Sequence, residues 1–417
     1  MMEYGCIAQK LGHSFSKSIH EKIDSYAYEL REVAPDELDA FMKARDFRGI
    51  NVTIPYKQAV LPYLDDVSET AKAIGAVNTI VNRGGKLFGD NTDFGGMTAL
   101  IRRMGLTLRG KKVLVLGTGG TSRTALAVAS SLGAAYAMPV SRQAKEGALT
   151  YDDVYRVHTD AQILINTTPV GMYPKTEGMA VRPDAFPALE GVVDAVYNPR
   201  RSELVQASRA LGVPAEGGLY MLVSQAVLAA RRFTGRDYPD TLTDDVYRAV
   251  LAEKENLVLI GMPGSGKTTV GRMAAERLGR TFVDLDDEIV RAAGRTIPEI
   301  FAKEGEQAFR DLESRVTREV SAQNGLVIAT GGGCVLREEN VRALRMNGRL
   351  LWLDRPLEQL VPTGDRPTAD SEEKMRALYR VREPVYRASA DAVIRSDGIA
   401  EHAASAVLER FSEELNR

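Results

Sequence analysis

The feature that most constrains this chain is the segment Gly261-Met262-Pro263-Gly264-Ser265-Gly266-Lys267-Thr268, which has the pattern of a phosphate-binding P-loop. Residues 256–260 before it, with the apolar run 257–260, indicate a buried strand, and the pattern after it indicates a helix. Lys267 would reach the terminal phosphates of a nucleotide, and the Thr268 hydroxyl would hold Mg²⁺. The residues expected to bind this nucleotide are Gly264, Ser265, Gly266, Lys267, Thr268 and Thr269.

A second glycine loop, Gly117-Thr118-Gly119-Gly120-Thr121-Ser122-Arg123, follows the apolar run 113–116. Glycines between a strand and a helix let a dinucleotide pyrophosphate approach the backbone. Arg142 follows the next predicted strand and favours the 2′-phosphate of NADP, although a solvated arginine at a strand end is equally common. The candidate NADP-binding residues are Gly117, Gly119, Gly120, Thr121, Ser122 and Arg142. Two different nucleotide motifs in one chain suggest a fusion of two enzymes.

The composition excludes several other classes of protein. A chain of 417 residues with 44% hydrophobic residues is long enough for about two to four globular domains. A net charge of −2 gives no reason to expect nucleic acid or a membrane as a partner. The longest apolar run, 219–230, is too short to cross a bilayer, and Cys6 and Cys334 are too few for a disulfide framework. We therefore expect a cytoplasmic protein that binds small molecules.

The pattern along the chain predicts an α/β fold in both halves. Strands are expected at 112–116, 135–140, 163–166 and 192–196, and then at 257–260, 281–285, 326–329 and 350–353. Alternating strands and helices predict parallel sheets, and residues 219–250 and 400–415 are expected to be helical. The expected domains are an N-terminal α/β substrate domain (1–98 plus 220–250), a Rossmann-like NADP domain (99–219), a linker (251–255) and a P-loop kinase α/β domain with a parallel sheet (256–417).

Four separated segments in the first half resemble shikimate dehydrogenase. They are His13-Ser14-Phe15-Ser16, Asn51-Val52-Thr53-Ile54-Pro55-Tyr56-Lys57, residues 75–79 with 89–95, and residues 218–225. The resemblance implies reversible, NADP-linked reduction of 3-dehydroshikimate to shikimate. The residues expected to bind this substrate are Ser14, Ser16, Thr53, Asn78, Tyr197 and Gln225.

Lys57 and Asp93 are the expected catalytic residues of this half. An ammonium group can stabilise and protonate the oxygen that becomes negative when hydride adds to a ketone. A nearby carboxylate, proposed to be Asp93, would keep Lys57 charged and orient it. Taken singly, Lys57 could be a surface lysine, Asp93 a helix N-cap, and Ser14 and Ser16 turn residues.

In the second half, the acceptor must be inferred from residues outside the P-loop. Asp284 and Asp286 flank Leu285 after a short predicted strand, where alternate side chains face the same side. One carboxylate could support Mg²⁺ and the other could accept a proton from the attacking hydroxyl, although an acidic strand end on the surface is as common. The glycines of Thr330-Gly331-Gly332-Gly333 permit close approach of a substrate to the backbone.

Residues 256–417 resemble shikimate kinase essentially from end to end. The resemblance implies that Asp286 binds the shikimate hydroxyls and serves as the base, and that Asp284 supports the metal. It further implies that Arg310 and Arg382 bind the substrate carboxylate beside Gly332, because the arginine fork matches both carboxylate oxygens. Arg366, in the predicted lid 363–371, would close on the transferred phosphate.

The two resemblances together predict a bifunctional enzyme that needs NADP(H), ATP and Mg²⁺. The product of the first half is the substrate of the second, so each assignment supports the other. Three alternatives stay open at this point. The first half could act on quinate, the second could phosphorylate another small polyol such as gluconate, or one half could be a non-catalytic binding or scaffold module.

Overall fold

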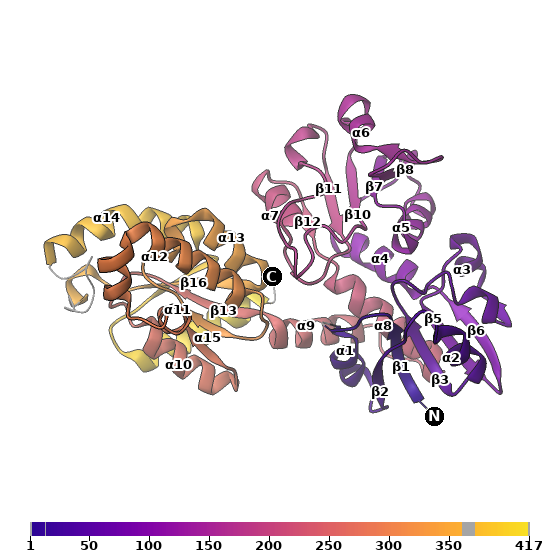
Figure 1. Ribbon diagram of the computed structural model, residues 1–417, viewed down its shortest axis with the longest axis horizontal. Coiled ribbons are helices and arrows are strands. Elements are labelled where there is room, and N and C mark those ends of the chain that lie inside the picture. Colours follow the sequence, from indigo (N-terminus) through magenta and orange to yellow (C-terminus); the bar gives the residue numbers. More distant parts are fainter. Residues whose placement is uncertain (1, 13, 361–371, 416–417) are drawn as a thin grey trace. The chain divides into compact units, whose positions relative to one another are not determined.

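The computed structural model of the protein describes residues 2–12, 14–360 and 372–415 (Figure 1). The chain forms two compact units, Met1–Val250 and Leu251–Arg417. All three sheets carry helices, as expected for an α/β fold. Within the described residues, no helix has the length and apolar character needed to cross a membrane.

The first sheet of unit 1 has the strand order β2-β1-β3-β5-β6-β4. Its strands are β1 (Met2–Ala8), β2 (Tyr28–Glu32), β3 (Phe47–Val52), β4 (Asp66–Val67), β5 (Thr79–Arg83) and β6 (Lys86–Asp90). The sheet is mixed, because β5 runs antiparallel to both β3 and β6. The accompanying helices are α1 (Ser16–Ile23), α2 (Leu38–Ala44) and α3 (Glu69–Ile74). Ile7, Ile50 and Ile80 belong to the core on this sheet.

The second sheet of unit 1 is parallel throughout and has the order β12-β11-β10-β7-β8-β9. Its strands are β7 (Lys112–Leu116), β8 (Tyr136–Ser141), β9 (Leu149–Thr150), β10 (Ile163–Asn166), β11 (Gly191–Asp194) and β12 (Ala215–Glu216). Its helices are α5 (Gly120–Ser131), α6 (Tyr151–Val157) and α7 (Glu203–Ala210). Strands β7 and β10 have the bounds predicted for them, 112–116 and 163–166. The strand predicted at 192–196 ends earlier, at Asp194. Asp194 accepts a hydrogen bond from the Val196 backbone, so the chain turns there instead of continuing the ladder.

Two helices pack together within unit 1 and connect its two sheets. Helix α4 (Thr92–Arg103) buries Met97 and Leu100 against the second sheet, and α8 (Leu219–Thr234) contacts strands β3 and β5 of the first. The helical stretch expected at 219–250 is interrupted after Thr234, where Gly235 adopts a φ of 70° and ends α8. Helix α9 (Leu242–Lys254) then runs through most of the segment expected to be a linker.

Unit 2 contains a five-stranded parallel sheet with the order β14-β15-β13-β16-β17. Its strands are β13 (Asn256–Ile260), β14 (Phe282–Asp284), β15 (Val327–Ala329), β16 (Gly348–Asp354) and β17 (Ala392–Arg395). Its helices are α10 (Lys267–Leu278), α11 (Leu285–Ala293), α12 (Ile297–Ser321), α13 (Glu338–Asn347), α14 (Glu372–Ser389) and α15 (Ala400–Leu415). The last helix has the predicted bounds. Short 3-10 helices lie at Leu61–Tyr63, Pro183–Ala185, Cys334–Leu336 and Leu357–Gln359.

Candidate active sites

A cavity of about 570 Å³ in unit 1 brings together residues from distant parts of the sequence. Lys57 and Asp93, the predicted catalytic pair, both line it. Every residue predicted to bind the first substrate lines it as well, namely Ser14, Ser16, Thr53, Asn78, Tyr197 and Gln225. His13, from the same predicted segment as Ser14, lies outside the described residues.

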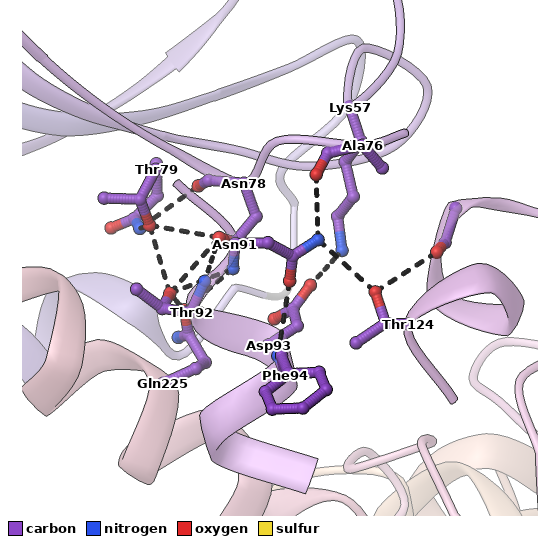
Figure 2. Close-up of polar contacts among 12 residues, drawn as sticks. Lys57, Ala76, Asn78, Thr79, Asn91, Thr92, Asp93, Phe94, Thr124 and Gln225 are labelled. Carbon is purple, nitrogen blue, oxygen red and sulfur yellow. Dashed lines mark hydrogen bonds and ion pairs between the residues drawn. The ribbon is translucent and has the colours of Figure 1, made fainter. Parts of the chain in front are cut away.

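The Lys57 Nζ donates a hydrogen bond of 2.5 Å to Asp93 Oδ2 (Figure 2). Lys57 follows β3 in a turn, and Asp93 lies in the first turn of α4. Their side chains are 13% and 9% exposed, so the pair is only slightly accessible to solvent. The N-cap of α4 is Asn91, whose side chain accepts from the Phe94 backbone. Asp93 is therefore not the helix cap, and its carboxylate is available to orient Lys57.

Amide and hydroxyl groups form a connected network in the wall of this cavity (Figure 2). Asn78 Oδ1 accepts a hydrogen bond of 2.7 Å from the Thr92 backbone, and its Nδ2 donates to Thr92 Oγ1 at 3.1 Å. Thr92 Oγ1 also lies 3.3 Å from Gln225 Oε1, to which it donates. Asn51 Nδ2 donates to Thr79 Oγ1 at 3.1 Å and extends the network into β3 and β5. Fixed neutral donors and acceptors of this kind suit a substrate with several hydroxyl groups.

Sequence reasoning missed Asn51, Thr79 and Thr92 as members of this network. All three lie inside segments that were already singled out, one or two residues from Thr53, Asn78 and Asp93. Their role could not be inferred because the hydrogen bonds join side chains 13 to 28 residues apart in the chain.

The glycine loop 117–123 lies directly beside the predicted catalytic pair. Gly117 has a φ of 114°, which favours glycine, and a Cβ at this position would lie 2.8 Å from Thr167 Oγ1. A Cβ on Gly120 would lie 3.6 Å from the Lys57 side chain, and Thr121 lines the same cavity as Lys57. The Ser122 hydroxyl donates to the Gly117 carbonyl at 2.7 Å, so this side chain holds the loop closed.

Two observations indicate that a dinucleotide fits this loop. Helix α5 begins after Gly119 without a side-chain cap, so its first backbone N–H groups remain available to a pyrophosphate. A Cβ at Gly119 would meet nothing within 4 Å, so there is open space above the loop.

Two further predicted residues have surroundings that suit their predicted roles. Arg142 lies just after β8 and is exposed, as expected for a residue that binds the ribose phosphate at the surface. Burial raises the pKa of Tyr197 to about 12, so this phenol stays protonated as a hydrogen-bond donor in the cavity.

In unit 2, the P-loop has the predicted strand–loop–helix context between β13 and α10. Gly264 and Gly266 have φ values of 79° and 95°, and α10 begins without a side-chain cap. Lys267 is buried, and its Nζ donates to the carbonyls of Gly261 and Met262 at 2.9 and 2.8 Å. These contacts hold the ammonium group over the loop, where it would meet a nucleotide phosphate. A nucleotide therefore fits this loop.

The two aspartates of unit 2 are arranged differently from the prediction. They were expected to share one face of a strand, but β14 ends at Asp284, which is the N-cap of α11, and Asp286 lies in the first turn of that helix. The reason is local, because Asp284 Oδ1 accepts from the Asp286 backbone and thereby begins the helix. Asp284 Oδ2 accepts a 2.7 Å hydrogen bond from Thr268 Oγ1. This hydroxyl–carboxylate pair suits Mg²⁺, which takes few protein ligands besides phosphate and water.

The triple glycine brings Asp286 and Arg310 together. A Cβ on Gly331 would lie 2.8 Å from Asp286 Oδ1, and one on Gly333 would lie 2.6 Å from Arg310 Nη1. Arg310 Nη1 donates a hydrogen bond of 2.7 Å to Glu313, a 1% exposed carboxylate that sequence reasoning did not single out. Burial raises the pKa of Glu313, with Arg310 opposing that effect and Asp286 adding to it.

Arg382 is the second predicted carboxylate-binding arginine of unit 2. It lies on α14 and is 4% exposed, and its buried Nε has no hydrogen-bond partner. Tyr386, one turn further along the helix, donates a hydrogen bond of 2.5 Å to the Gly332 carbonyl and so ties α14 to the glycine loop. A buried donor without a partner is costly, which fits a side chain that binds a ligand. Arg366 and the predicted lid 363–371 lie outside the described residues.

Comparisons with known proteins match both halves of the chain. A family model described as shikimate dehydrogenase substrate binding domain matches residues 6–80, and one described as shikimate kinase matches residues 263–412. The shikimate dehydrogenase (NADP(+)) of Clostridium beijerinckii is 36% identical over 262 residues. That alignment covers 58% of this chain and 96% of the relative.

Solved structures resemble the first half. A chorismate mutase/shikimate 5-dehydrogenase fusion protein from Clostridium acetobutylicum matches with a TM-score of 0.57 at 31% identity, over 60% of this chain and 97% of that chain. Shikimate 5-dehydrogenase from Thermus thermophilus, in complex with NADP(H) and shikimate, matches with a TM-score of 0.52 at 28% identity, over 60% of this chain and 99% of that one. The chain therefore belongs to the shikimate dehydrogenase family, and it carries a shikimate kinase domain in its C-terminal part.

Proposed function

We propose that this protein catalyses two consecutive steps of the shikimate pathway. Unit 1 reduces 3-dehydroshikimate reversibly to shikimate with NADPH, and unit 2 phosphorylates the 3-hydroxyl of shikimate with ATP and Mg²⁺. The observation that carries the proposal is the hydrogen-bonded pair Lys57–Asp93, which lies beside a dinucleotide loop in a cavity walled by amides and hydroxyls. Unit 2 supplies the step that consumes the product of unit 1.

In the proposed reduction, each group in the cavity has one role. The bound reduced dinucleotide supplies the hydride that adds to the substrate ketone. Lys57 stabilises the oxygen as it becomes negative and gives it a proton, and Asp93 keeps the ammonium charged and oriented. Asn78 and Gln225 hold hydroxyl groups of the substrate, as do Ser14, Ser16, Thr53 and Tyr197. In the reverse reaction, Lys57 takes the proton back from shikimate.

Phosphoryl transfer depends mainly on position and charge. Bound ATP provides the phosphoryl group, and the P-loop with Lys267 holds its phosphates. Thr268 and Asp284 are the proposed protein contacts of Mg²⁺, and Asp286 accepts the proton of the attacking hydroxyl. Arg310 and Arg382 bind the carboxylate of shikimate beside Gly332. We also assign Arg366 to the transferred phosphate.

We assign substrate binding in the first half to residues 1–98 with 220–250 and dinucleotide binding to residues 99–219. Residues 256–417 form the kinase, and 251–255 join the two halves. We place the enzyme in the cytoplasm, a location supported by two buried free cysteines, Cys6 and Cys334. Its proposed partners are small molecules, with no nucleic acid or membrane among them.

One coupled assay tests both halves. The purified chain is given 3-dehydroshikimate, NADPH, ATP and Mg²⁺, while NADPH absorbance and shikimate 3-phosphate are followed by spectroscopy and mass spectrometry. Formation of shikimate 3-phosphate that requires both cofactors is the expected result. Consumption of NADPH with accumulation of shikimate contradicts the kinase assignment. Phosphorylation of added shikimate without NADPH oxidation contradicts the dehydrogenase assignment, and quinate with NADP then becomes the substrate to test.

A further inference from the structure

Arg355 lies next to the P-loop, although it is not part of the P-loop motif. It follows β16, the strand beside β13 in the sheet, and its Nη1 lies 3.5 Å from the Gly264 carbonyl oxygen. On its other side is Gly398, in the turn after β17, where a Cβ would lie 3.3 Å from Arg355 Nη2. The guanidinium group therefore lies between the phosphate loop and the turn that leads into α15.

The charge and hydrogen-bonding capacity of Arg355 are largely unused. Its Nε is buried and has no hydrogen-bond partner, and its contact with Gly264 is at the limit of hydrogen-bond length. Within residues 2–12, 14–360 and 372–415 it forms no ion pair with a carboxylate, whereas Arg310 pairs with Glu313 at 2.7 Å. A partly buried donor left without a partner is costly, and a ligand is a common explanation.

The order of the strands indicates which part of a nucleotide would meet Arg355. All five strands are parallel, so the loops after their carboxyl ends lie along one edge of the sheet. The residues proposed to act on the acceptor, Asp286 and the triple glycine, follow β14 and β15 on one side of the P-loop strand β13. Arg355 follows β16 on the other side. A nucleotide whose terminal phosphate points toward β15 thus extends its inner phosphates toward β16.

We propose that Arg355 binds the inner phosphates of the nucleotide, those that remain on ADP after transfer. The inference rests on the proposed kinase function of unit 2. An arginine fork binds phosphate oxygens through two hydrogen bonds and carries its charge at every physiological pH. On binding, Arg355 exchanges its weak contact with the Gly264 carbonyl for phosphate oxygens. Because these phosphates are held before and after transfer, Arg355 affects nucleotide affinity and leaves the chemical step unchanged.

The test compares Arg355→Gln with Arg395→Gln in the full-length chain. Arg395 ends the neighbouring strand β17 and is exposed, so it controls for loss of one positive charge at the same edge. Binding of Mg·ADP is measured by titration calorimetry, and KM for ATP by steady-state kinetics with shikimate. For Arg355→Gln we expect Kd and KM to rise about tenfold, the usual size of a charge-assisted hydrogen bond, with kcat within about twofold of the parent. Arg395→Gln should bind ADP as the parent does.

Two results overturn the proposal: unchanged ADP binding in Arg355→Gln, or an equal loss in Arg395→Gln. If Arg355→Gln unfolds at a lower temperature without nucleotide, Arg355→Lys replaces it, and the expected rise in Kd becomes about two- to fivefold.

Binding of ADP needs no acceptor, so it separates this proposal from the shikimate kinase assignment. A parent chain that binds ADP but does not phosphorylate shikimate contradicts the acceptor assignment, and the effect of Arg355 on ADP binding is still measured.

Discussion

Lys57 and Asp93 are 36 residues apart in sequence and form a 2.5 Å hydrogen bond in the cavity of unit 1. The carboxylate holds the ammonium group where a ketone oxygen would be protonated, so removing the ammonium removes the acid. We expect Lys57→Ala to lower kcat for NADPH oxidation with 3-dehydroshikimate by roughly 10²–10⁴-fold. Initial rates of NADPH loss measure this change.

The matched control for that variant is Lys10→Ala, because Lys10 also lines the cavity but its side chain is 86% exposed. It should retain most of the activity. ATP turnover with shikimate should be unchanged in both variants. Parallel loss of kinase activity in a folded Lys57→Ala protein would contradict independent active sites.

Lys267→Ala gives the reciprocal prediction for unit 2. The Lys267 ammonium lies over the P-loop, fixed by two backbone carbonyls, and no other part of the loop can replace its charge on the phosphates. Phosphorylation of shikimate should fall by at least about 10²-fold, as is typical when a charge that stabilises a transition state is removed. Reduction of 3-dehydroshikimate should continue at the parental rate. Measuring both reactions on one preparation shows whether the loss is confined to the kinase.

Gly331→Ala tests whether the glycine loop and Asp286 form one acceptor site. The added methyl group would lie 2.8 Å from Asp286 Oδ1 and 3.2 Å from Glu313 Oε1, so the Asp286 carboxylate must shift. We expect kcat/KM for shikimate to fall by about 10²-fold, because small displacements of a catalytic group have effects of that size. Binding of Mg·ADP serves as the internal control and should not change. Parental kinetics with shikimate would show that Asp286 does not act at this position.

The fold could be predicted where local pattern alone determines it. The strand Lys112–Leu116 and the helix Ala400–Leu415 have the predicted bounds. The strand contains a continuous apolar run that ends before Gly117, and the helix has an amphipathic pattern. The two-residue strands β9 and β12 were missed, since pairs such as Leu149–Thr150 are too short to show any period. They exist only through pairing with a neighbour in the folded sheet.

The candidate sites could be predicted as sets of residues but not as geometry. Motifs identified Lys57, Asp93 and Asp286, because their chemistry is specific to residue type. The hydrogen-bond network through Thr92 and the position of Arg355 depend on tertiary contacts, which leave no periodic signal in a single sequence. Asp284 does lie at the end of the strand predicted there, but the helix that begins at Leu285 and includes Asp286 was not predicted.

The two cysteines provide a test of burial in both units. Cys6 is 3% exposed and Cys334 is fully buried, and burial raises the pKa of each thiol, that of Cys6 to about 12. Since the thiolate is the reactive species, neither should react with a disulfide reagent at pH 8 within minutes, while two thiols react after denaturation. Ile54→Cys, at a position 70% exposed beside the same cavity as Cys6, should react at once. A rapidly reacting thiol in the unmodified native chain would contradict the buried setting.

Asp194 predicts how the stability of unit 1 depends on pH. Its carboxylate is fully buried at the end of β11 and accepts hydrogen bonds from Asn166 Nδ2, the Val196 backbone and Ser202 Oγ. Burial nevertheless dominates these contacts and raises its pKa from 3.8 to about 6. The folded state therefore binds this proton more tightly than the unfolded state does. The resulting stabilisation is complete below pH 4 and disappears as the pH rises through 6, a difference of about 3 kcal/mol.

Asp194→Asn isolates this contribution, because the amide keeps the carbonyl acceptor for Asn166 and Val196 but does not titrate. His20, whose pKa burial lowers to about 3, acts in the opposite sense, since its stabilisation is lost as the pH falls below 6.5. The informative quantity is therefore the difference in Tm between Asp194→Asn and the parent, measured by calorimetry at pH 4.5 and pH 7.5. His20 is present in both proteins and cancels. The Tm of the variant minus that of the parent should be higher at pH 7.5 than at pH 4.5, by roughly 4–8 °C for a unit of this size, because about 2 kcal/mol of the effect falls between these pH values. An equal difference at both pH values would mean that Asp194 is ionised throughout this range.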